Sequence, residues 1–264
     1  MPRMSVPDFR ERKHSGDKLS VLTAYDYPSA QAVDGAGVDA ILVGDSCAMV
    51  IMGHESTLSI TLDEMIHHAA MVSRGTENAL VIADMPFMSY QVSDEKAVHN
   101  AGRLIAEGGA QCVKLEGPAA LFGDTIRAIR RASIPVMGHI GLTPQSIHSL
   151  GGYKVQGRDT ESREALLEAA KGLDEAGCFG IVLECIPADL ADEITAAVSC
   201  PTIGIGAGSG TDGQVLVMHD ILGWGFTRFS KTFVDVKSQM HEAFSSYVAE
   251  VKSGDFPAKE NEYS

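Results

Sequence analysis

The chain has 264 residues, of which 45% are hydrophobic and 21% are charged, as is usual in a soluble globular protein. This composition excludes a disordered chain, and no apolar run approaches the roughly 18 residues of a membrane helix. Thirty-five acidic against 21 basic residues give a formal net charge of -14, so neither nucleic acid nor an anionic membrane is an expected partner.

The cysteines and the N-terminus indicate a cytoplasmic protein. Five cysteines without a CxxC spacing argue against a disulfide framework and favour a reducing compartment. The first residues, MPRMSVPDFRERKHSGDK, lack the hydrophobic core of a signal peptide. In such an acidic protein, a small anionic substrate would need local positive charge from a lysine or a metal ion.

Short apolar runs typical of buried strands alternate with helical patterns along the chain. Runs that are buried on both faces and separated by helices predict a parallel sheet. Helices are expected to begin near Thr61, Ser93, Thr160 and Pro187. The strand-like runs are 20–24, 40–43, 80–83, 112–115, 135–138, 180–183, 201–205 and 214–218.

Eight strands predict a closed (β/α)8 barrel, formed as a single domain over residues 1–264. Only 206–213 separates the last two strands, which is short for a crossover helix, so an open doubly wound sheet is the alternative. Apolar residues at helical spacing predict a C-terminal helix from about residue 232, followed by a polar tail that frays from about residue 253.

Acidic residues end most of the apolar runs, and three of them follow consecutive strands: Asp45, Asp84 and Glu116. In a parallel barrel these positions meet at the C-terminal face. Carboxylates that lie close together repel one another, so the free-energy cost of keeping them ionised is small only beside a cation. Their oxygen ligands favour Mg²⁺ or Mn²⁺ as that cation. The alternative is that each acid, like Asp26 or Asp220, merely caps a helix.

Three further side chains are candidates for chemistry at this face. Lys114 points to the same side of its strand as Glu116, where it would bind an anion or form a structural ion pair. Glu184 lies two strands away among apolar neighbours, which favours a base, although it could also cap a loop. His139 could orient substrate, move a proton or be structural.

Three other signals are weaker. The glycine-rich stretch 138–159 indicates either a mobile lid or an ordered surface loop. The run GIGAGSG at 204–210 resembles a phosphate cradle, but tight turns explain it equally well. Cys47 could be a nucleophile, although no activating group is identifiable near it in the sequence.

Six motifs follow one another along most of the chain: VLTAYDYPSA (21–30), ILVGDS (41–46), ADMPFMSY (83–90), VKLEG (113–117), GHIGLTPQ (138–145) and PTIGIGAGSGTDGQVLVMHD (201–220). In this order they resemble the ketopantoate hydroxymethyltransferase family over about 19–223. The resemblance implies a (β/α)8 barrel of the phosphoenolpyruvate/pyruvate superfamily type, Mg²⁺, and 5,10-methylenetetrahydrofolate as co-substrate. It also implies ketopantoate as the product, for pantothenate biosynthesis, and commonly a homodecamer.

At the positions where the motifs match, the resemblance implies a role for each residue. Asp45 would bind the metal and the keto acid, and Ser46 would contact the keto acid. Asp84 would support both metal and substrate. Lys114 would bind the keto acid, and Glu116 would bind the metal.

Glu184 matches the family's proton acceptor. The resemblance implies that it removes the C3 proton of 3-methyl-2-oxobutanoate, and that a Mg²⁺-stabilised enolate then attacks the one-carbon unit of the folate. A Mg²⁺-dependent lyase or phosphonomutase of the same superfamily is one alternative, although the KxCGH-like loop of those lyases is missing from this sequence. A non-catalytic barrel is the other.

Overall fold

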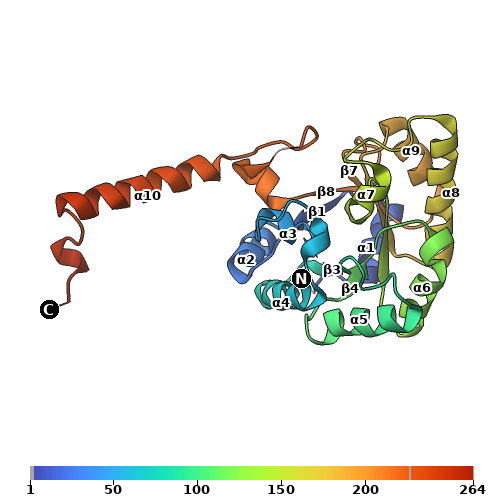
Figure 1. Ribbon diagram of the computed structural model, residues 1–264, viewed down its shortest axis with the longest axis horizontal. Coiled ribbons are helices and arrows are strands. Elements are labelled where there is room, and N and C mark those ends of the chain that lie inside the picture. Colours follow the sequence, from blue (N-terminus) through green and yellow to red (C-terminus); the bar gives the residue numbers. More distant parts are fainter. Residues whose placement is uncertain (1–2, 226, 264) are drawn as a thin grey trace. The chain divides into compact units, whose positions relative to one another are not determined.

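Eight parallel strands close into a barrel in the computed structural model, which describes residues 3–225 and 227–263 (Figure 1). Each strand pairs with the next one along the chain, and β8 pairs with β1. The prediction of a (β/α)8 barrel is confirmed, and the open sheet is wrong. The strands are β1 (Leu19–Thr23), β2 (Ala40–Val43), β3 (Leu80–Asp84), β4 (Cys112–Lys114), β5 (Val136–Gly141), β6 (Gly180–Glu184), β7 (Thr202–Ile205) and β8 (Gly213–Leu216).

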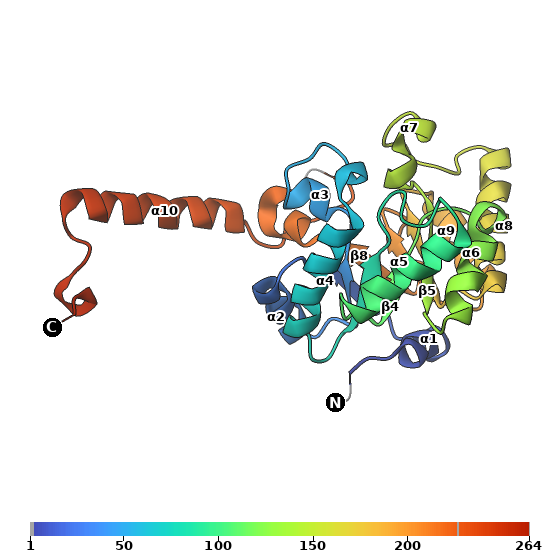
Figure 2. The same ribbon diagram turned by 60° about the horizontal axis from the view of Figure 1, so that its bottom comes forward.

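Helices lie on the outer side of the strands, as Figure 2 shows for α5 and α6 beside β4 and β5. The predicted starts at Thr61 and Ser93 are confirmed, since both side chains accept a hydrogen bond from the first turn of their helix. The α-helices are α1 (Val6–Ser15), α2 (Tyr27–Gly35), α3 (Cys47–Val50), α4 (Leu62–Gly75), α5 (Asp94–Ala106), α6 (Ala119–Arg131), α7 (Ile147–Leu150), α8 (Thr160–Ala176), α9 (Ala188–Ala197) and α10 (Val236–Ser253).

Four short turns of other helical types complete the elements: η1 (Thr57–Ser59), η2 (Pro144–Ser146), η3 (Asp220–Trp224) and η4 (Lys259–Asn261). The link between β7 and β8 is a loop without a helix, so the run at 204–210 does not lead into a helix N-terminus. Such a helix would be needed for a phosphate cradle of the dinucleotide-binding kind.

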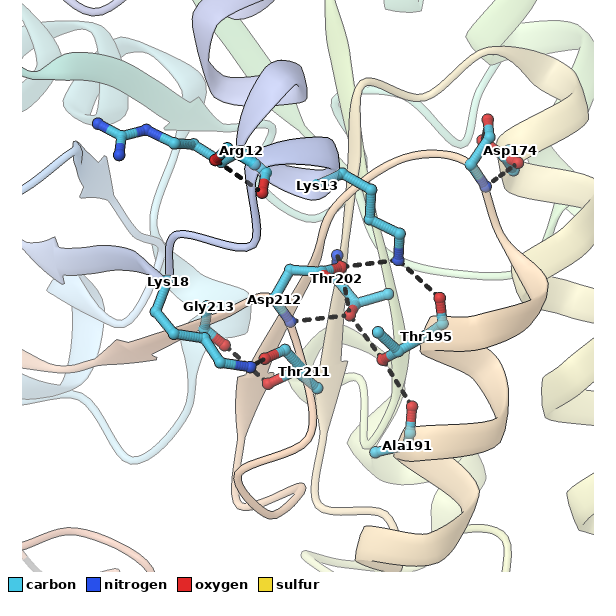
Figure 3. Close-up of polar contacts among 12 residues, drawn as sticks. Arg12, Lys13, Lys18, Asp174, Ala191, Thr195, Thr202, Thr211, Asp212 and Gly213 are labelled. Atoms are coloured by element: carbon cyan, nitrogen blue, oxygen red, sulfur yellow. Dashed lines mark hydrogen bonds and ion pairs between the residues drawn. The ribbon is translucent and has the colours of Figure 1, made fainter.

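The N-terminal helix α1, which the sequence pattern did not predict, packs against the core of the barrel. Phe9 is fully buried, and its ring meets that of Phe179 edge-on at a centroid distance of 5.6 Å. Lys13 Nζ lies 2.8 Å from Asp212 Oδ2, which also accepts a hydrogen bond from the backbone N–H of Thr202 (Figure 3). These contacts tie α1 to the start of β7 and to the residue before β8.

The chain divides into two compact units, Met1–Val217 and Met218–Ser264, and the whole barrel belongs to the first. In the second unit, α10 begins at Val236 rather than near residue 232, because the side chain of Asp235 caps it by accepting from the Ser238 N–H. None of the helices in the described residues is long and apolar enough to cross a membrane. The exposed apolar side chains of α10 are Met240, Phe244, Tyr247, Val248 and Val251.

Candidate functional site

Three acids meet where β2, β3 and β4 end. Asp45 follows β2, Asp84 is the last residue of β3, and Glu116 follows β4. All three are buried, and the backbone N–H of Asp45 donates to Asp84 Oδ2 at 3.0 Å. The fold therefore gathers the acids of three successive strands into one buried group, which we call the acid cluster.

Lys114 lies within the acid cluster. Its Nζ is 2.9 Å from Asp84 Oδ1 and 4.0 Å from Glu116 Oε1. Burial acts to lower the pKa of Lys114, but the attraction of Asp84, Glu116 and Asp45 outweighs it and raises the pKa above its usual range. The ammonium therefore remains charged in a place from which water is largely excluded.

His139 on β5 stands between the acid cluster and Glu184, the last residue of β6. Its Nδ1 lies 3.3 Å from Glu116 Oε1, and its Nε2 lies 3.2 Å from Glu184 Oε2. Burial and the Lys114 charge lower the pKa of His139, yet the two carboxylates outweigh them and raise it to about 9. The side chain of Glu184 is 15% exposed, against 2% for Glu116, so it is the more accessible acid.

Two glycines allow close approaches around these side chains. A Cβ on Gly44 would lie 2.9 Å from Ser46 Oγ, so a larger residue there would force the Ser46 side chain to move. Gly141 has φ +96°, and a Cβ there would lie only 2.2 Å from the backbone oxygen of Glu184. Ser46 itself is half-buried, and its Oγ lies 2.8 Å from the Tyr25 hydroxyl.

The three acids of the cluster differ in how well their charges are compensated. Burial, followed by repulsion from Asp84 and Glu116, raises the pKa of Asp45 well above its usual value. Burial also raises the pKa of Asp84, although Lys114 opposes it. At Glu116, His139 and Lys114 outweigh burial and lower the pKa. Asp45 is thus the acid that a further cation would help most.

The charge balance and the donor atoms fit a divalent cation. The four carboxyl groups of the acid cluster and of Glu184 lie around only two basic side chains, Lys114 and His139, so acidic groups outnumber basic ones here. Carboxylate oxygens are hard ligands of the kind that Mg²⁺ and Mn²⁺ prefer. A ready ligand set is not preformed, however: in residues 3–225 and 227–263, no three His, Cys, Asp or Glu side chains are grouped so that they could hold a metal ion.

Gln145 and Tyr90 also reach the acid cluster, although the sequence reasoning assigned them no role. The side chain of Gln145 donates to Asp45 Oδ2 at 2.9 Å, and its backbone N–H donates to Glu116 Oε2 at 2.9 Å. The hydroxyl of Tyr90 lies 2.8 Å from Gln145 Oε1. Both residues end motifs of the resemblance, ADMPFMSY and GHIGLTPQ, and this was the one signal that could have identified them.

Other candidates from the sequence lie outside the acid cluster. Asp26 caps α2 by accepting from the Ser29 N–H, as the capping alternative expected. Burial raises the pKa of the Cys47 thiol to about 12, which argues against a nucleophile. Asp220 belongs to the second compact unit, where it accepts a hydrogen bond from Thr227.

The stretch 138–159 contains the end of β5, then η2 and α7, so part of this glycine-rich segment is helical. Beneath it lies a cavity of about 580 Å³ that borders Glu116 and Gln145. The apolar part of its wall includes Leu121, Phe122 and Leu166. A space of this size beside the acid cluster can admit a small organic molecule.

Comparison with known proteins agrees with the motifs. The family model described as ketopantoate hydroxymethyltransferase matches residues 3–259. The chain is 56% identical over 260 residues to 3-methyl-2-oxobutanoate hydroxymethyltransferase of Clostridium novyi (strain NT), covering 97% of this chain and 94% of the relative. The enzyme of the same name from Enterococcus faecalis (strain ATCC 700802 / V583) is 55% identical, with 96% of this chain and 93% of the relative covered.

Solved structures share the fold at low sequence identity. Phosphonopyruvate hydrolase in complex with oxalate and Mg²⁺ superposes with a TM-score of 0.64 at 13% identity, covering 99% of this chain and 93% of that one. A 2,3-dimethylmalate lyase of the PEP mutase/isocitrate lyase superfamily gives a TM-score of 0.64 at 17% identity, covering 93% of this chain and 87% of that one. The barrel is therefore of the type found in that superfamily.

The hydrolase and lyase neighbours are too distant in sequence to indicate a reaction, whereas the curated relatives share more than half of their residues with this chain over nearly its whole length. With the family model covering residues 3–259, the chain belongs to the ketopantoate hydroxymethyltransferase family and is a transferase.

Proposed function

We propose that the chain transfers a hydroxymethyl group from 5,10-methylenetetrahydrofolate to 3-methyl-2-oxobutanoate, giving ketopantoate for pantothenate biosynthesis. The observation that carries this proposal is the division of the acids into two places. Asp45, Asp84 and Glu116 form a buried cluster around Lys114, whereas Glu184 stands beyond His139 and is more open. One place suits the binding of a charged substrate, and the other suits a base.

In this proposal the acid cluster binds and orients the keto acid. Asp45, Asp84 and Glu116 would hold Mg²⁺, and Lys114 would offset the negative charge of the substrate carboxylate. Ser46, whose hydroxyl already meets that of Tyr25, would contact the keto acid. When bound, Mg²⁺ supplies positive charge that stabilises an enolate oxygen and so makes the C3 proton of the keto acid more acidic.

Glu184 is the proton acceptor of the proposed reaction. Its Oε2 would take the C3 proton, and the carbon that loses it would form a bond to the one-carbon unit of the folate. A water molecule would supply the hydroxyl group of ketopantoate, and the folate would leave as tetrahydrofolate. His139 Nε2, 3.2 Å from that same oxygen, would hold the carboxylate in place. The cavity beneath 138–159 would limit bulk water around the reactive carbon while admitting the one water molecule that the transfer consumes.

The test is an assay with 3-methyl-2-oxobutanoate and 5,10-methylenetetrahydrofolate, with and without Mg²⁺. We expect ketopantoate only when all three are present. Cleavage of the keto acid, or turnover of a phosphonate in its place, would instead indicate a lyase or a phosphonomutase. Binding of the keto acid without any turnover would indicate a non-catalytic barrel.

We also propose a cytoplasmic location and a homodecameric assembly. All five cysteines are free thiols, which suits a reducing compartment. Exposed apolar side chains such as Phe244 and Tyr247 on α10 would be covered by another copy of the chain. Sedimentation equilibrium tests the assembly, and a monomer at micromolar concentration would contradict it.

A further inference from the structure

Gln145 occupies an unusual position for a neutral side chain. It lies in η2, near the start of the stretch that links β5 to α8, and it is only 5% exposed. Its neighbours in space come from other parts of the chain, with Asp45 one hundred residues away in sequence. A buried amide needs hydrogen-bond partners for both its N–H groups and its oxygen, so the contacts of Gln145 determine where its side chain lies.

The donors of Gln145 contact two acids of the cluster and one carbonyl. Side-chain Nε2 donates to Asp45 Oδ2 at 2.9 Å and to the backbone oxygen of Met85 at 3.0 Å. The backbone N–H donates to Glu116 Oε2 at 2.9 Å. One residue thus holds an oxygen of the acid that follows β2 and an oxygen of the acid that follows β4.

The other end of the amide is fixed as well. Oε1 of Gln145 accepts from Gln91 Nε2 at 3.3 Å and from the Tyr90 hydroxyl at 2.8 Å. The Tyr90 oxygen itself accepts from the backbone N–H of Glu116, and its hydroxyl hydrogen has Gln145 Oε1 at 2.8 Å and the Glu116 carbonyl oxygen at 3.1 Å as acceptors. With donors at one end and acceptors at the other, the network leaves the amide a single orientation.

We infer that Gln145 is a positioning residue that holds Asp45 and couples the stretch 142–159 to the acid cluster. This inference rests on the proposed function, in which Asp45 binds the metal and the keto acid. Gln145 bonds to Asp45 Oδ2, so the other carboxylate oxygen, Oδ1, would be left to bind the metal or the keto acid. Because the coupling is reciprocal, the same bond holds the stretch 142–159 in place.

The first test uses limited trypsin digestion of the whole protein without ligands. Lys154 lies in the coupled stretch and is exposed. In Gln145→Met, which removes the amide and keeps a similar length, we expect cleavage after Lys154 to be about tenfold faster, since a buried hydrogen bond is lost. Cleavage after the exposed Arg131 on α6 is the internal reference and should not change.

Gln91→Met is the matched control. Gln91 contacts the same amide oxygen, but its own side chain is not bonded to Asp45 or Glu116 in the contacts described above. Parent-like cleavage after Lys154 is expected in this variant. Equal acceleration in Gln91→Met and Gln145→Met would overturn the inference, because the effect would then not depend on the acid cluster.

A third variant breaks the contact from its other side. Asp45→Ala should also speed cleavage after Lys154, and adding Gln145→Met to it should bring little further change, since both remove one bond. Fully additive effects would contradict the coupling. The single Asp45→Ala measurement still tests the coupling if Gln145→Met folds poorly, since parent-like cleavage after Lys154 in Asp45→Ala would contradict it.

The second readout is direct Mg²⁺ binding in the presence of the keto acid, measured by calorimetry. Loss of a residue that orients a ligating group commonly weakens metal binding about 10-fold to 100-fold, and we expect this in Gln145→Met but not in Gln91→Met. Parent-like affinity in Gln145→Met would refute the positioning role. A parent protein that makes no ketopantoate would instead refute the proposed function, and the trypsin result would still decide whether Gln145 couples the stretch.

Discussion

Replacing Lys114 with Met should destabilise the fold strongly. Lys114 Nζ lies 2.9 Å from Asp84 Oδ1, and the two side chains are 5% and 3% exposed. Methionine fills a similar volume but leaves Asp84 and Glu116 without their shared ammonium. Removing one partner of a buried ion pair costs about 3–5 kcal/mol, because the remaining charge is buried without compensation.

The size of this loss should depend on pH. Burial raises the pKa of Asp84 and Asp45, and Lys114 opposes the rise at both, so its removal would raise both pKa values further. A carboxyl whose pKa is higher in the folded state destabilises the fold above that pKa. The penalty shrinks as the pH falls through the folded pKa and disappears below the unfolded one. The deficit should therefore be largest in alkaline buffer and smaller in mildly acidic buffer.

The assay is urea unfolding followed by circular dichroism, with EDTA present, at about pH 8 and about pH 5. Lys171→Met is the matched control, since Lys171 forms a 2.8 Å pair with Glu168 on the surface of α8. That change should cost no more than about 1 kcal/mol. The reasoning is refuted if Lys114→Met lowers the free energy of unfolding no more than the control does at the higher pH. It is also refuted if Lys114→Met lowers that free energy by the same amount at both pH values.

Three further changes test other parts of the molecule. Glu184→Gln should lower kcat for ketopantoate formation about 100-fold by removing the base while leaving binding of Mg²⁺ and keto acid nearly intact, and near-parental turnover would end that assignment. Asp45→Ala should weaken Mg²⁺-dependent binding of the keto acid about tenfold or more in calorimetry, whereas an unchanged Mg²⁺ dependence would reject the ligand role. Phe9→Ala should cost about 3–5 kcal/mol in urea unfolding, because a fully buried ring against Phe179 is lost, and a loss under about 1 kcal/mol would mean that the core repacks around the gap.

Local patterns in the sequence were sufficient for the eight strands, whereas the closure of the sheet into a barrel stayed open against a doubly wound sheet until the β1–β8 pairing was seen. Apolar runs alternating with capped helices predicted all eight strands, and the caps at Thr61 and Ser93 have their predicted hydrogen bonds. Strand ends also located the acids, because parallel strands present their last residues at one face. The helix α1 was missed because its one fully buried residue, Phe9, gives too little periodicity to mark an amphipathic helix.

What the sequence determined by itself was which residues lie at the ends of strands, since capping and hydrophobic periodicity act within a few residues of each other. It identified Asp45, Asp84, Lys114, Glu116 and Glu184 as neighbours of one barrel face. Only the tertiary structure decided that His139 stands between the acid cluster and Glu184, and that Gln145 bonds to Asp45. Such contacts join side chains from different strands and loops, so they follow from how whole elements pack, and no short-range pattern encodes that packing.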